Sequence, residues 1–140
     1  MTNIVELERV MTFIKDNPER HNQQVWANKC GTAACLAGWT CLLNGYSIDI
    51  EAIENAQKSF SFPIGDALFG GPIMAPDGRK LRIREEAMEL LDLDRDDGDI
   101  LFCSENTVDQ LELMVKDLSN DEGLCDRWEP VLDGYRRREP

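Results

Sequence analysis

The stretch from residue 30 to residue 43 carries no charged side chain, yet it holds three of the five cysteines and one of the three tryptophans. A helix that is apolar or small on every side belongs in a protein core. Thr32 suits the N-cap of such a helix, and Asn44-Gly45 suits a left-handed C-terminal cap. The sequence therefore predicts a buried central helix at about residues 32–43, whose small side chains let neighbouring helices come close.

Apolar residues recur at helical spacing in several other stretches. Pro18 ends the first of them, because proline disfavours helix in the residue before it. Asp94 and Thr107 suit N-caps, and Thr107 with Gln110 fits a capping box. The helices expected in this way cover residues 2–16, 47–58, 84–93, a short stretch after Asp94 and the stretch that begins at Thr107.

One short segment has β-sheet character. Pro76-Asp77-Gly78 is a turn sequence between two apolar stretches, so we expect a small β-hairpin at about residues 73–83. The predicted fold is mainly α, a compact single-domain helical bundle around the helix at 32–43, with the domain at residues 1–135 and a disordered tail at 136–140. The predicted core comprises Ile4, Leu7, Val10, Met11, Ile14, Trp26, Cys35, Leu36, Trp39, Leu42, Leu90, Leu91, Leu101, Phe102, Leu111, Met114, Val115 and Leu118.

The charge of the chain is strongly acidic and unevenly spread. The formal net charge is −12, and residues 81–140 contribute eighteen acidic against eight basic side chains. Such a field repels nucleic-acid backbone and anionic membranes, so we expect direct binding to neither. No apolar run reaches the length of a membrane span and no secretion signal is visible, which predicts a cytoplasmic protein with reduced cysteines.

A metal site is one alternative reading of the N-terminal third. His21, Cys30, Cys35 and Cys41 are all residue types that bind zinc. The spacing lacks the paired, closely spaced cysteines of structural zinc sites, and Cys35 and Cys41 lie ~120° apart around a helix. Buried thiols packed as small apolar groups explain these cysteines more simply, so no cofactor is expected.

A thiol nucleophile is the second alternative. The sequence Cys30-Gly31 at the start of a helix resembles, at a distance, the active-site helix of papain-like proteases, whose motif is shorter between its cysteines. A helix N-terminus lowers the pKa of a thiol. That chemistry also needs a downstream histidine as base, and no histidine follows His21. The sequence therefore predicts no catalytic residue, and thiol or metal chemistry at these four residues stays the alternative.

Eight acidic residues fall between positions 85 and 99, opposed only by Arg95. A calcium loop requires glycine at its sixth position and glutamate at its twelfth, and no register of this segment provides both. A solvated acidic surface is the simplest interpretation, and a binding surface for a protein partner is the functional one. The residues predicted to bind that partner are Glu85, Glu86, Glu89, Asp92, Asp96, Asp97 and Asp99.

The string Cys-Gly-Thr-Ala-Ala-Cys-Leu-Ala-Gly-Trp at 30–39, after Asn17-Pro18 and Trp26, resembles a set of small uncharacterised proteins of actinobacteria and their phages. The resemblance covers about residues 4–45, and more loosely 87–102, where Asp92 replaces a common glycine. It implies a small cytoplasmic accessory protein of a kind that phage genomes encode, and it implies no particular activity. Our expectation is a non-enzymatic interaction protein. Such a protein would act in the host cytoplasm on a host protein through its acidic surface, and could form an oligomer.

Overall fold

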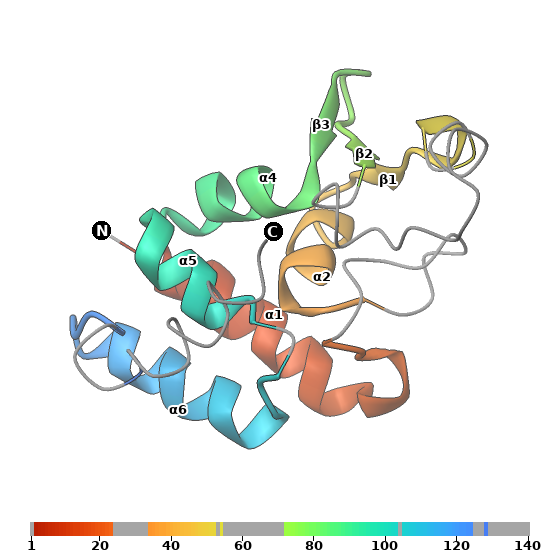
Figure 1. Ribbon diagram of the computed structural model, residues 1–140. Helices are drawn as coiled ribbons and strands as arrows, with labels where there is room; N and C mark the ends of the chain where they lie inside the picture. Colours follow the sequence, from red (N-terminus) through yellow and green to blue (C-terminus); the bar gives the residue numbers. More distant parts are fainter. Residues whose placement is uncertain are drawn as a thin grey trace.

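The structure, a computed structural model, describes residues 2–23, 34–52, 54, 72–103, 105–124 and 128. This part of the chain is mainly helical and includes a small antiparallel sheet (Figure 1). The helices are α1 (Ile4–Asp16), the 3-10 turn η1 (Pro18–Arg20), α2 (Leu36–Leu42), α4 (Ile83–Leu91), α5 (Arg95–Leu101) and α6 (Val108–Ser119). The strands are β1 (Ser47–Ile48), β2 (Pro72–Met74) and β3 (Lys80–Arg82).

Helix α1 packs against α6 on one side and against α2 and α4 on the other (Figure 1). Asn3 caps its start, because the Asn3 side chain accepts a hydrogen bond from the Glu6 amide. The helix ends at Asp16, directly before Asn17-Pro18, as predicted. Its buried side chains recur every three or four residues and face the neighbouring helices.

Helix α2 begins at Leu36, so the predicted start near residue 32 is wrong. The Cys35 sulfur caps the helix, accepting a hydrogen bond from the Gly38 amide at 3.4 Å. Ala34 cannot be helical because it pairs with His21 in an isolated parallel β-bridge, in which the Asn22 amide donates to the Ala34 carbonyl oxygen at 3.0 Å. The expected cap, Thr32, lies outside the described residues.

The C-terminal end of α2 agrees with the sequence. Gly45 adopts a left-handed conformation, with φ +86°. The Gly45 amide donates to the Leu42 carbonyl oxygen at 3.3 Å, and the Tyr46 amide donates to that of Cys41 at 3.2 Å. These two bonds form a Schellman motif. Every residue from 36 to 41 is buried.

The predicted hairpin is present as β2 and β3, with Ile73 opposite Leu81. In its turn the Gly78 amide donates to the Ala75 carbonyl oxygen at 2.9 Å, and Gly78 has φ +90°. The Asp77 side chain accepts a hydrogen bond from the Arg79 amide at 3.1 Å. Each residue of Pro-Asp-Gly therefore has the role that its chemistry predicts.

A third strand, β1, extends the hairpin where a helix over residues 47–58 was expected. Ser47 and Ile48 pair with Met74 and Ile73 of β2. Helical structure begins only at residue 50, and residues 55–58 lie outside the described part. The expected helix is therefore wrong at its start, because the exposed edge of β2 offers hydrogen bonds that local sequence does not reveal.

The helices α4 to α6 begin close to their predicted positions, and α4 ends within two residues of its predicted end. The Asp94 side chain accepts a hydrogen bond from the Asp97 amide at 2.8 Å and so caps α5. Thr107 and Gln110 form the complete capping box of α6. Asp92 ends α4 with φ +52°, a left-handed position where glycine is the usual residue.

The predicted core is largely confirmed. Of its members, Ile4, Leu42 and Leu90 are only partly buried, and Trp26 lies outside the described residues. The prediction missed the fully buried Ile73, Ile83, Ile100 and Leu124. None of the helices in the described ranges is long and apolar enough to cross a membrane.

Candidate functional site

The exposed acids of α4 form one stripe. Glu85, Glu89 and Asp92 are separated by four and three residues, which places them on the same side of a helix. All three are exposed, as are Asp94 and Asp96 at the start of α5. Helix α5 follows directly after the turn at residues 92–94 and packs on α4 (Figure 1). We call these five residues the acidic face.

Three of the seven residues predicted to bind a partner lie inside the protein or partly inside it. Glu86 is 8% exposed and accepts a hydrogen bond from the Tyr46 hydroxyl at 2.8 Å. Burial, reinforced by this bond to Glu86, raises the pKa of Tyr46 to about 12. Asp97 is half-buried and accepts a hydrogen bond from the Leu124 amide at 2.9 Å, and burial raises the pKa of its carboxyl.

Asp99, the third of these residues, forms an internal ion pair. Its side chain is 2% exposed and is paired with Arg84 of α4, whose own side chain is 21% exposed. Arg95 approaches the other carboxylate oxygen of Asp99 at 3.7 Å from the solvent side. The pair links α5 to the first turn of α4, so it fixes the two helices that carry the acidic face.

The helix dipole favours some of these acids at their positions in the helices and disfavours others. Asp94, Asp96 and Asp97 lie at the start of α5, where the helix dipole favours negative charge. Glu89 and Asp92 lie at the end of α4, where the dipole disfavours it, and the last turn of α4 has no basic residue. Glu85, in contrast, lies in the favourable first turn of α4 and pairs with Arg84 at 3.4 Å. Repulsion between Glu89 and the acids one turn away adds to the cost at the end of the helix. Helix stability therefore does not account for the charge at Glu89 and Asp92.

The residues proposed for metal or thiol chemistry do not form a site in the described part. Cys30 lies outside it, and no group of three or more His, Cys, Asp or Glu side chains that could hold a metal occurs within it. Cys35 and Cys41 are buried, and Cys41 donates to the Ile83 carbonyl oxygen at 3.7 Å. Burial raises the pKa of Cys35 to about 11 and raises that of Cys41 as well. A nucleophilic thiol requires the opposite shift.

His21 takes part in a buried hydrogen-bond network centred on Gln23, which sequence reasoning missed. The Gln23 side-chain NH₂ donates to the carbonyl oxygens of Leu101 at 3.3 Å and Cys103 at 3.1 Å. Its oxygen accepts from the Leu36 amide at 3.2 Å and lies 2.9 Å from His21 Nε2. Because that oxygen can only accept, His21 Nε2 is the donor. Nothing in the polar segment 18–29 distinguishes Gln23 as buried.

Comparison of the chain with protein-family models, with curated protein sequences and with solved structures finds no significant match. The function is therefore inferred from the site itself.

Proposed function

We propose that this protein is a non-enzymatic interaction protein that binds a basic surface of a partner protein through its acidic face. The observation that carries the proposal is the position of Glu89 and Asp92, which share one side of α4 with Glu85 and lie at the end of the helix where negative charge is disfavoured. A basic partner would neutralise that charge. The net charge of −12 would accelerate encounter with such a partner over a long range.

The buried acids support this proposal by holding the exposed ones in place. Asp99 joins α5 to α4 through Arg84, and Asp97 joins α5 to the segment at Leu124. The exposed carboxylates are therefore carried on two helices that are tied to each other and to the core. A surface that is already ordered loses less entropy when it binds.

The proposal includes a place of action. In line with the resemblance to proteins of actinobacteria and their phages, we infer a small accessory protein of the cytoplasm. If it is phage-encoded, the partner is a host protein in the host cytoplasm. The negative field also supports a protein partner over a nucleic acid or a membrane.

Removal of the stripe should abolish partner binding. In the test variant Glu85→Lys, Glu89→Lys and Asp92→Asn are combined, with asparagine at position 92 because it tolerates the left-handed conformation. We expect recovery of the partner from host lysate at moderate salt to fall at least about tenfold, since each lost charge contact contributes up to ~1 kcal/mol.

A matched control makes the same change in net charge elsewhere. Asp16→Lys, Glu19→Lys and Glu51→Gln alter exposed acids outside the acidic face. This control should retain the partner. If both variants recovered as much partner as the wild type, the acidic face would not be the binding surface. If both variants lost the partner equally, binding would depend on net charge and not on the acidic face.

We also propose that α2 is the centre of the helical bundle. Residues 36–41 are all buried, and both α1 and α4 pack against this helix. Enlarging a buried residue in this helix or just before it should overpack the core, so Gly38→Leu and Ala34→Leu should each lower the free energy of unfolding by about 1–3 kcal/mol or more. Urea denaturation measures the change, and wild-type stability of both variants would contradict the proposal.

A further inference from the structure

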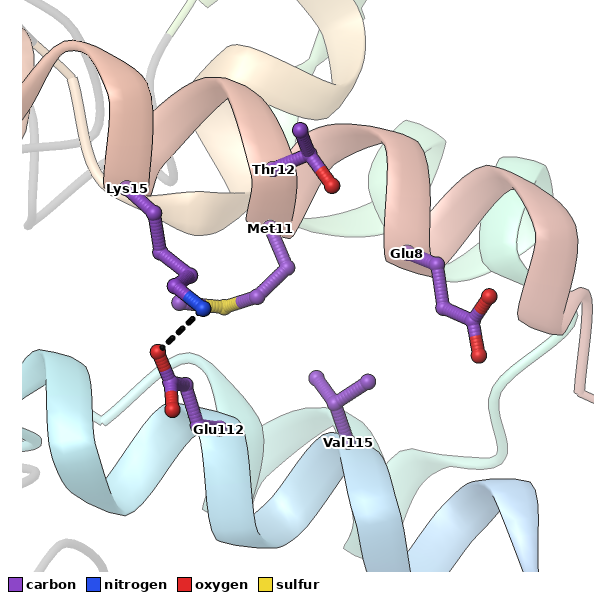
Figure 2. A pocket seen from close by; sticks show the side chains of 6 residues that line it. All are labelled: Glu8, Met11, Thr12, Lys15, Glu112 and Val115. Atoms are coloured by element: carbon purple, nitrogen blue, oxygen red, sulfur yellow. Dashed lines mark ion pairs between the residues drawn. The ribbon is translucent and has the colours of Figure 1, made fainter.

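A groove with a cavity volume of about 280 Å³ lies between α1 and α6 (Figure 2). The buried Met11 and Val115 provide its apolar surface. At one end the Lys15 ammonium nitrogen lies 3.0 Å from a Glu112 carboxylate oxygen, and this ion pair spans the two helices. Glu8 lies at the other end. The lining residues are Glu8, Met11, Thr12, Lys15, Glu112 and Val115.

The charge of the groove is not balanced. The single ammonium group is engaged by Glu112, which leaves the carboxylate of Glu8 as excess negative charge at the opposite end. Among the described residues, no lysine, arginine or histidine lies within ion-pair distance of Glu8. The groove therefore joins an apolar surface to a carboxylate that a bound cation could neutralise.

The surface beyond Glu8 is apolar. Val5 precedes Glu8 by three residues, so the two side chains are neighbours on the surface of α1. Val5 is 82% exposed, more than any other large apolar side chain in the described part of the chain. An occupant that reaches Glu8 would thus find an apolar contact immediately outside the groove.

The chemistry of the groove selects its occupant. Its volume of about 280 Å³ lies at the lower limit for small-molecule pockets and is sufficient for one long side chain. Arginine has an apolar stem and a planar, weakly hydrated head that can bind a carboxylate through two hydrogen bonds. The excess carboxylate disfavours phosphate groups and therefore nucleic acids and anionic lipids.

We propose that the groove between α1 and α6 binds an arginine side chain of a partner protein. The arginine stem packs on Met11 and Val115, its guanidinium group donates to Glu8, and an adjacent apolar residue of the partner contacts Val5. This docking site shares no residue with the acidic face, so it goes beyond the proposed function and can be tested separately from it.

The test uses three blocked peptides of the form Ac-Leu-Ala-X-Ala-NH₂, in which X is arginine, citrulline or norleucine. Citrulline keeps the shape of arginine but has no charge. The protein is labelled at its methionine methyl groups, and the Met11 signal is assigned with Met11→Leu. We expect the Met11 signal to shift with increasing arginine peptide until it saturates. The citrulline and norleucine peptides should bind at least about fivefold more weakly, because they cannot form the exposed ion pair.

Two variants locate the charge. Glu8→Gln should weaken binding of the arginine peptide about fivefold. Glu19→Gln, an exposed acid in η1, has the same net charge and should bind like wild type. A Met11 signal that does not saturate, equal binding of the arginine and citrulline peptides, or equal effects of the two variants would each overturn the proposal. The peptide comparison on the wild-type protein does not depend on the folding of any variant.

Discussion

Gln23→Leu should lower the free energy of unfolding by about 1–3 kcal/mol. Gln23 is 8% exposed, and its amide group satisfies two backbone carbonyl oxygens and one backbone amide from distant parts of the chain. Leucine has a similar size but can bond to none of them. A buried polar group that loses its partner costs about 1–3 kcal/mol. Here the Leu36 amide loses the Gln23 oxygen, while the Leu101 and Cys103 carbonyl oxygens each keep a hydrogen bond from Asn106. Urea denaturation followed by circular dichroism measures the loss.

The adjacent exposed residue provides the control. Asn22→Leu makes a comparable polar-to-apolar change beside Gln23, and its backbone amide still donates to the Ala34 carbonyl oxygen. We expect a change within about 0.5 kcal/mol, as is usual at the surface. If Gln23→Leu changed the free energy of unfolding as little as this control does, the hydrogen bonds of Gln23 would not be what holds the segment at His21 to α2 and to the end of α5.

Features that depend on neighbouring residues could be predicted from the sequence. Asp94 and Thr107 cap their helices through bonds that reach only three residues, and Gly78 completes a four-residue turn. In each case the residue type and the required conformation lie within one short segment. The amphipathic pattern likewise identified most of the core, because burial follows helical periodicity.

Features that depend on distant residues were missed. The start of α2 is set by the bridge between Ala34 and His21, and β1 exists because β2 lies beside it. Neither pairing leaves a local signal in the sequence. The network around Gln23 joins residues that are 78 and 80 positions apart, so a buried glutamine cannot be distinguished from a solvated one.

The candidate site was predicted only in part, and one error was avoidable. Glu86 lies three residues after Ile83 and one before Ala87, so helical periodicity places it within the apolar stripe of α4. It should have been assigned to the interior. The burial of Asp99 had no such signal, because its partner Arg84 belongs to a different helix.

Arg84→Met should also lower the free energy of unfolding by about 3 kcal/mol. It removes the closer of the two guanidinium groups that pair with Asp99, whose side chain is 2% exposed, and breaking a buried ion pair is strongly destabilising. Arg95→Met is a matched control, because Arg95 contacts the same carboxylate at 3.7 Å but is 72% exposed. We expect that control to cost less than about 1 kcal/mol, as for other exposed ion pairs.

A double variant separates the value of the Arg84–Asp99 pair from the cost of breaking it. Arg84→Met combined with Asp99→Leu removes both charges of the pair, so most of the lost stability should return, and denaturant titration of the four proteins gives the coupling free energy. Additive losses would show that the two side chains do not act as a pair. The double variant keeps all five residues of the acidic face. Weaker partner binding by this variant would therefore mean that the pair positions α4 and α5 for binding as well as stabilising them.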